Sequence, residues 1–198
     1  MSEPLPRLPR HAGPAVVLDD ASSPTARSAL GLIVSRAVSV DLAIDGIRLA
    51  AFDFQRKDLQ RLEQGRVVIG GFDNQSLQGA VDTASVVPVY VSNLLVLRDL
   101  LGSGRLEVRS GGPRRWSPDL CVARGPALTR WFEGGAVALV GYLGLGADHP
   151  FIGPRLTCVV AGAGPLSVVS DAFGRLWSGG HDILGVVADA LERFRVES

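Results

Sequence analysis

Residues 100–146 read LLGSGRLEVRSGGPRRWSPDLCVARGPALTRWFEGGAVALVGYLGLG. Within this stretch, residues 105–109 alternate between charged and apolar side chains, whereas residues 119–123 and 136–140 are mostly apolar. Alternation and short apolar runs are both typical of β-strands. Connections that contain glycine or proline separate the three segments. We therefore expect three successive strands of one sheet.

Further helices and strands are expected on both sides of this stretch. Hydrophobic periodicity and capping residues predict helices at residues 22–37, 56–64, 91–101, 167–177 and 181–196. Strands are predicted at residues 39–44, 66–70 and 155–161. Strands and helices alternate at first, and strands then cluster in the second half. The pattern predicts an α/β (mixed α+β) sandwich, in which helices flank a central mixed β-sheet.

The chain is expected to divide into an N-terminal arm and one domain. Residues 1–14 are polar and rich in proline, which is typical of an extended or disordered segment. We expect residues 1–21 to form a flexible arm. Residues 22–198 contain no internal repeat or linker, and we expect them to form a single domain.

The composition argues against several classes of protein. The 20 basic and 20 acidic residues give a net charge of zero, unlike a protein that coats nucleic acid through a general basic excess. The longest uncharged runs, residues 83–97 and 156–170, are shorter than the roughly 20 apolar residues that span a bilayer. The N-terminus lacks the apolar core of a signal peptide, and two cysteines make no disulfide framework. We expect a cytoplasmic protein, and the preference for arginine over lysine indicates a GC-rich bacterial gene.

Four segments follow one another in an order that resembles the phospholipase D-like superfamily of phosphodiesterases and nucleases. They are LLGSGRLEVRS (residues 100–110), RRWSPDLCVARG (114–125), GGAVALVGYLGLG (134–146) and DAFGRLW (171–177). In that family a strand ending in a basic residue precedes a His-x-Lys strand, and a hairpin leads to a strand reading aliphatic-Gly-Ser-x-Asn. A later helix ends in Phe-x-x-Leu-Trp. The resemblance covers most of residues 23–177, and it implies a phospholipase D-like sandwich.

The catalytic residues of the family are absent from the matching positions. The family's histidine, which attacks phosphorus, falls on Ser117, and its lysine falls on Asp119, which inverts the charge. The trailing acidic position falls on or near Arg124. Gly141 is retained, but the serine position falls around Tyr142 and the asparagine position around Gly144. The resemblance therefore implies that the ancestral reaction is lost.

Other side chains of the same region are candidates for repurposed chemistry. They are Ser117, Asp119, Tyr142, Asp148 and His149. A carboxylate in place of a lysine suits a cationic or neutral substrate better than a phosphate. An ordinary loop histidine before Pro150 is the favoured interpretation of His149.

No metal site or cofactor is expected. Cys121 and Cys158 lie in apolar strands, where buried, inert thiols are common, and no second ligand stands at metal-binding spacing. The glycines of residues 141–146 do not have the dinucleotide-binding spacing, and no helix is predicted after them. Tight turns and close backbone packing account for these glycines.

An arginine-rich segment is the candidate surface for a ligand or partner. Between residues 105 and 130 it carries Arg105, Arg109, Arg114, Arg115, Trp116 and Arg124, together with Arg130. Proteins use arginine with interleaved aromatic side chains to bind phosphate groups and stacked bases, and also to anchor interfaces with other proteins. An ordinary solvated edge of the sheet remains an equal alternative.

Three functions follow from these observations. The leading hypothesis is a non-catalytic phospholipase D-like module, acting as a scaffold or regulatory subunit in a bacterial nucleic-acid-processing or defence system. Single-domain members of the family usually pair, which implies a homodimer, and a further protein partner is expected. The alternatives are an enzyme with repurposed chemistry in the former phosphodiesterase cleft, and a nucleic-acid-binding module that uses the arginine-rich segment.

Overall fold

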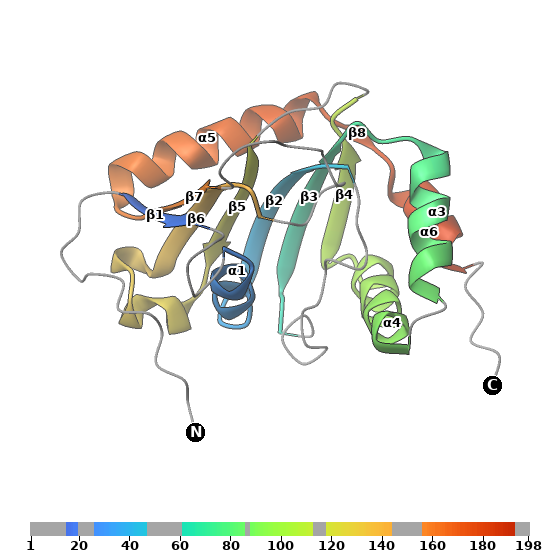
Figure 1. The fold of residues 1–198 in the computed structure, drawn as a ribbon, viewed down its shortest axis with the longest axis horizontal. Helices are drawn as coiled ribbons and strands as arrows, with labels where there is room; N and C mark the ends of the chain where they lie inside the picture. Colours follow the sequence, from blue (N-terminus) through green and yellow to red (C-terminus); the bar gives the residue numbers. More distant parts are fainter. Residues whose placement is uncertain are drawn as a thin grey trace.

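The computed structural model describes residues 15–19, 26–46, 61–85, 88–112, 118–143 and 156–192. These residues form a sheet of eight strands with helices on both faces (Figure 1). The strands are β1 (Ala15–Asp19), β2 (Ser39–Asp45), β3 (Gln64–Gly70), β4 (Leu106–Ser110), β5 (Asp119–Arg124), β6 (Ala136–Gly141), β7 (Leu156–Val160) and β8 (His181–Asp182). The helices are α1 (Ala26–Val34), α3 (Asn74–Ser85), α4 (Pro88–Gly102), α5 (Ala163–Gly179) and α6 (Leu184–Glu192), with 3-10 turns η2 (Pro126–Arg130) and η3 (Glu133–Gly135).

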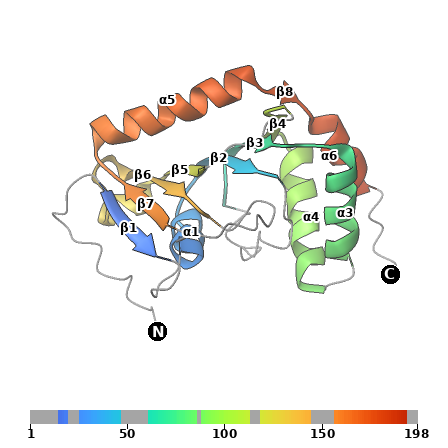
Figure 2. The same ribbon diagram turned by 45° about the horizontal axis from the view of Figure 1, so that its top comes forward.

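The sheet is mixed, with strand order β1-β7-β6-β5-β2-β3-β4-β8. Strands β2, β3 and β4 are parallel, and the other neighbouring pairs are antiparallel. Helix α5 crosses one face of the sheet, and helices α1, α3 and α4 lie on the other side (Figure 2). Helix α6 packs with α3, α4 and β4. The predicted fold class, a mixed α/β sandwich with helices flanking a central mixed sheet, is confirmed.

Alternate residues of β2 divide the interior into two cores. Val40, Leu42 and Ile44 belong to the larger core, on the side of α1, α3, α4 and α6. Ala43 belongs to a smaller core, in which Phe173 of α5 is buried. The strand predicted at residues 39–44 is therefore present as β2, and both faces of this central strand are covered.

Most of the predicted elements are present. The strands expected at residues 39–44, 66–70, 105–109, 119–123, 136–140 and 155–161 correspond to β2 to β7. The helices expected at 22–37, 91–101 and 167–177 correspond to α1, α4 and α5, within a few residues at each end. No helix among the described residues combines the length and apolar character needed to cross a membrane.

Three predictions about elements need correction. Residues 15–19, assigned to the flexible arm, form β1, because their backbone pairs with β7. The helix predicted at residues 56–64 is not formed at residues 61–64. There, Glu63 and Gln64 donate backbone hydrogen bonds to the Val38 carbonyl, and β3 begins at Gln64. Residues 56–60 lie outside the described part of the chain.

The last helix begins later than predicted. His181 and Asp182 pair with β4 as the short strand β8, and helix α6 begins at Leu184. The Asp182 carboxylate accepts a hydrogen bond from the Leu184 backbone N–H at 2.8 Å, as a capping residue does.

Helix α3 is not foreseen by the sequence pattern. Among its described side chains, Leu77 and Val81, four residues apart, lie in the larger core. The rest of the segment is mostly polar and small.

Candidate functional site

Several strands end at one edge of the sheet, and Asp119 connects them there. Asp119 begins β5 and is buried, with 8% of its surface exposed. One carboxylate oxygen accepts the backbone N–H of Asp45, at the end of β2, at 3.2 Å. The other accepts the backbone N–H of Leu143, just after β6, also at 3.2 Å. Asp119 therefore links the ends of the two strands, β2 and β6, that lie on either side of β5.

Gly141, at the end of β6, has a backbone conformation that a side chain would not tolerate. Its φ of 145° lies in the region that favours glycine, and an added Cβ would collide with the backbone oxygen of Leu156. The next residue, Tyr142, donates its backbone N–H to Leu156, and its carbonyl accepts the Thr157 hydroxyl at 2.7 Å. Close backbone packing, as expected from the sequence, explains this glycine.

The structure brings together two of the five candidate catalytic residues. Asp119 lies directly opposite Gly141 in the β5–β6 pairing, so that Asp119 and Tyr142 share one edge of the sheet. Ser117, Asp148 and His149 lie outside the described residues. A second carboxylate, Asp45, is also buried at this edge, and the sequence analysis did not single it out.

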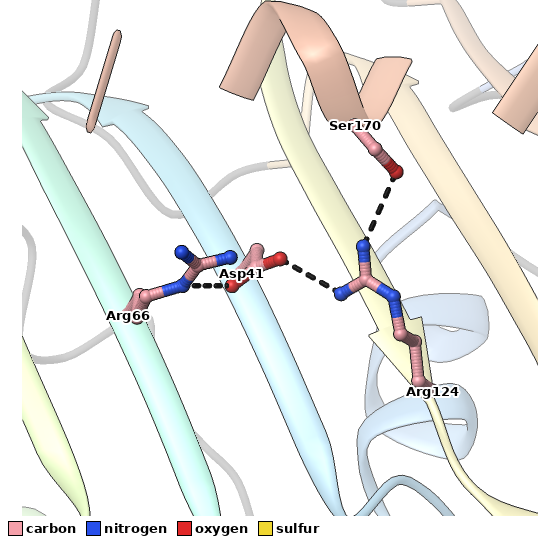
Figure 3. Close-up of polar contacts among 4 residues, drawn as sticks. All are labelled: Asp41, Arg66, Arg124 and Ser170. Carbon is pink, nitrogen blue, oxygen red and sulfur yellow. Dashed lines mark hydrogen bonds and ion pairs between the residues drawn. The ribbon is translucent and has the colours of Figure 1, made fainter. Parts of the chain in front are cut away.

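A second group of polar residues lies on the α5 face of the sheet (Figure 3). Asp41 of β2 is buried, and its two carboxylate oxygens accept hydrogen bonds from Arg66 of β3 and Arg124 of β5, each at 2.7 Å. Arg124 also donates to the hydroxyl of Ser170 in α5 at 3.2 Å. The Asp41 side chain is 3% exposed, whereas the Arg66 and Arg124 side chains are 31% and 38% exposed. One buried carboxylate thus holds two partly exposed guanidinium groups.

Aromatic side chains of α5 complete this group. The Arg109 guanidinium lies 4.3 Å from the centre of the Trp177 ring, and that of Arg66 lies 5.4 Å from it. Arg109 also donates to the Trp177 carbonyl at 2.9 Å. Phe173 stacks on Trp177, with ring centres 6.0 Å apart, and Arg66 lies 5.0 Å from the Phe173 ring. Cation–π contacts of this kind fix the guanidinium groups in place.

A hydrogen bond shifts the pKa of Arg66, and burial shifts that of Cys121. The hydrogen bond from Arg66 to Asp41 raises the pKa of the Arg66 guanidinium, against the opposing effect of partial burial. Burial raises the pKa of the Cys121 thiol from 9.0 to about 12, with a smaller contribution from the negative charge of Asp41. Arg66 therefore remains a cation, and Cys121 a neutral thiol.

The predicted arginine-rich surface is only partly assembled in the structure. Arg109 and Arg124 lie on the α5 face together, but Arg105 donates to the Leu62 carbonyl and to Ser103 at the start of β4. Arg130 lies 5.8 Å from the ring of Trp131, which packs against the larger core. The remaining members, Arg114, Arg115 and Trp116, lie outside the described residues.

Sequence reasoning missed Asp41, Arg66, Ser170 and Trp177 as members of the group. A signal was present in strand β2, where Asp41 interrupts the apolar sequence SVDLAID at a position that becomes buried. A buried carboxylate requires a partner. The identity of that partner depends on the register of β2 against β3, which no local pattern shows.

Within the described residues, no three His, Cys, Asp or Glu side chains are grouped so that they could hold a metal ion.

Comparisons with known proteins bear on the fold. No family model matches this chain, and no curated protein matches it. TrmBL2, an archaeal chromatin protein with a novel mode of DNA binding, is similar in structure, with a TM-score of 0.52 and 9% sequence identity over 86% of this chain and 54% of that one. This chain thus spans about half the length of TrmBL2. The likeness shows a shared fold.

A phospholipase D family member is also among the similar structures. Nuc from Salmonella typhimurium has a TM-score of 0.49 and 12% identity, over 85% of this chain and 96% of that one.

Proposed function

We propose that this chain is a non-catalytic phospholipase D-like module, which acts as a dimeric scaffold or regulatory subunit in a bacterial nucleic-acid-processing or defence system. The observation that carries the proposal is the position of Asp119. By the resemblance in sequence, Asp119 stands where the family has the lysine that holds phosphate, and both of its oxygens accept backbone hydrogen bonds.

The physical argument concerns what a phosphodiesterase site must supply. Catalysis of phosphoryl transfer needs fixed donors or cations around the phosphate oxygens. A carboxylate supplies neither, and it repels the phosphate group. Asp119 is also held at the strand ends by Asp45 and Leu143, so that it stabilises the fold at the position where the family binds its substrate.

The test is a phosphodiesterase assay on the purified full chain. A chromogenic phosphodiester and a single-stranded oligonucleotide are incubated with the wild type and with Asp119→Asn. We expect no hydrolysis above the rate in buffer for either protein. Hydrolysis by the wild type that is lost in Asp119→Asn would overturn the proposal in favour of repurposed chemistry at this edge.

The dimeric state has a separate test. Because single-domain members of the family pair, we expect sedimentation equilibrium at micromolar concentration to give twice the mass of the chain. A monomer across the concentration range would remove the dimeric part of the proposal and leave the non-catalytic part standing.

A nucleic-acid-binding module is the second candidate. The observation in its favour is that Arg66, Arg109 and Arg124 lie together on the α5 face, and TrmBL2, which shares the fold, binds DNA. Binding through phosphates releases counterions, so the affinity for DNA should fall steeply with salt. An affinity that does not change with salt would exclude this candidate.

A further inference from the structure

Three arginines from three strands face helix α5, and they are partly open to solvent. They are Arg66, Arg109 and Arg124, which we call the α5-side arginine cluster. We propose that this cluster is a binding site for a phosphate group. The site is separate from the strand ends that Asp119 connects, and the inference does not require the chain to be either catalytic or inactive.

The first argument is that the cluster is oriented in advance. Asp41 lies beneath Arg66 and Arg124 and fixes both guanidinium groups through bonds of 2.7 Å. A buried ion pair contributes little net stability compared with well-packed apolar side chains, because removing the charges from water is costly. Its effect here is to hold two arginine side chains in defined positions, which lowers the entropy lost when a ligand binds.

The second argument is that donors remain available. Among the contacts between described residues, Arg66 uses one N–H on Asp41, and Arg109 uses one on the Trp177 carbonyl. Arg124 uses one on Asp41 and one on Ser170. A guanidinium carries more N–H donors than these, in a planar arrangement that matches the oxygens of a phosphate. The exposed fractions of Arg66 and Arg124, 31% and 38%, allow a ligand to reach them.

The acidic neighbours of the cluster decide how strongly it attracts an anion. Asp41 lies beneath it, Glu107 of β4 pairs with Arg66, and Asp182 of β8 pairs with Arg109. The Asp41 carboxylate is engaged by Arg66 and Arg124, and the Asp182 carboxylate accepts the Leu184 N–H. Glu107 is exposed beside the cluster, and it opposes an approaching anion. Removing the charge of Glu107 should strengthen binding.

The aromatic contacts indicate which part of a ligand is recognised. The Trp177 ring is already contacted by Arg109, Arg66 and Phe173, at 4.3, 5.4 and 6.0 Å from its centre. Stacking of a nucleic acid base on this ring would have to compete with these contacts. The site therefore offers charge-assisted hydrogen bonds to an oxyanion, and base stacking is not part of it.

The experiment measures phosphate binding by the full chain. Melting temperature and calorimetric affinity are recorded with sodium phosphate, against sodium chloride at equal ionic strength. Arg109→Gln removes one donor group, and Arg98→Gln, an exposed arginine of α4 on the other face, is its control. Glu107→Gln removes the opposing charge, and Glu192→Gln, exposed at the end of α6, is its control.

We expect phosphate to stabilise the wild type more than chloride does. Loss of one charge-assisted hydrogen bond should weaken binding by about tenfold in Arg109→Gln. Glu107→Gln should bind several-fold more tightly, and both controls should bind like the wild type. Phosphate and chloride acting equally, or Glu107→Gln binding no more tightly than Glu192→Gln, would overturn the proposal.

A competition experiment identifies the source of the phosphate group. If a single-stranded oligonucleotide displaces inorganic phosphate, and does so regardless of base sequence, the site takes the backbone of a polynucleotide. If only inorganic phosphate and nucleoside monophosphates compete, the site takes a small phosphate ligand. Both results support a phosphate site, whereas competition that depends on the base would contradict the argument from Trp177.

Discussion

Asp41 is a single buried side chain on which two arginines depend. Its carboxylate binds Arg66 and Arg124 from the strands on either side, at 2.7 Å each. Replacing one partner of such a group leaves the other charges without compensation, which costs more than the pair contributes when intact. The two arginines are about a third exposed, so that water reduces this cost.

Asp41→Asn is therefore expected to lower the free energy of unfolding by about 2 kcal/mol, because the amide keeps the shape but removes the charge. Asp99→Asn, which changes an exposed aspartate of α4, should change it by less than about 0.5 kcal/mol. Urea denaturation of the three proteins measures both values. Equal stability of Asp41→Asn and wild type would show that the ion pairs do not stabilise the fold.

The buried thiol of Cys121 makes the stability of the fold depend on pH in the alkaline range. Burial raises the pKa of its thiol from 9.0 to about 12. Between these values the unfolded chain loses the thiol proton while the folded chain keeps it. The folded state then binds more protons, so its stability falls as pH rises above about 9, by up to about 1.4 kcal/mol per pH unit.

Urea denaturation at pH 8, 9 and 10 tests whether stability falls as pH rises. The free energy of unfolding should fall less steeply with pH in Cys121→Ala than in the wild type, whatever stability the substitution itself removes. Cys158→Ala is the matched control, because Cys158 is only half-buried. Identical slopes for all three proteins would contradict the effect of burial.

At the scale of the element, helix α5 is held to the sheet by few buried groups. Phe173 is the buried residue of this helix, with 1% of its surface exposed. On either side, Ser170 and the Trp177 carbonyl bind arginines of the sheet. Phe173 is thus the central side chain of the smaller core, and partly buried apolar side chains of the same helix pack around it: Leu166, Val169, Ala172, Leu176 and Trp177.

Phe173→Ala should lower the free energy of unfolding by about 3–5 kcal/mol, since it removes a large buried side chain and leaves a cavity. Val168→Ala on the same helix, where the valine is 67% exposed, should change it by less than about 0.5 kcal/mol. Urea denaturation again gives both values. A loss in Phe173→Ala no larger than that in Val168→Ala would mean that α5 does not depend on this contact.

The elements that could be predicted from sequence are those whose pattern is local. The alternation of β2 and the apolar runs of β5 and β6 reflect burial on one or both faces. Helix α3 has apolar residues at helical spacing, but half of them are alanines among polar residues, and the sequence analysis overlooked them. Strand β1 is defined by its pairing with β7, far away in the chain. A contact with a distant strand leaves no local signal.

The candidate sites also differ in whether they depend on local sequence or on contacts between distant strands. The sequence analysis put Asp119 and Tyr142 in one set of candidate residues, and the β5–β6 register sets Asp119 opposite Gly141, the residue before Tyr142. The partnership of Asp41, Arg66 and Arg124 instead depends on how three strands are aligned side by side. That alignment is a property of the whole sheet.

At the scale of the whole molecule, β1 and β8 form the two edges of the sheet. Strand β1 covers β7, although Ala15 and its partner Val160 are 145 positions apart in the chain. An uncovered edge strand offers free backbone groups to other chains. Residues 1–21, which were expected to form a flexible arm, therefore include the strand at one edge of the sheet.

A chain that begins at residue 22 should consequently melt several degrees lower than the full chain and should associate more readily. The matched control begins at residue 13, which keeps β1. Thermal melting and light scattering on the three proteins show whether residues 15–19 stabilise the sheet as an edge strand or belong to a flexible arm. Equal behaviour of both shortened chains would indicate that β1 does not contribute to the stability of the sheet.

The shared aspartate has a consequence for how the sheet is assembled. A strand that pairs one residue out of step turns every side chain to the opposite face. Such a slip of β2 would place Asp41 among the apolar residues that surround Val40 and Leu42, and it would leave Arg66 and Arg124 without their carboxylate. An unpaired carboxylate in an apolar core is costly. The charges that hold three strands together in the native sheet thus also discriminate against its mispaired forms, so that the correct alignment is selected as well as stabilised.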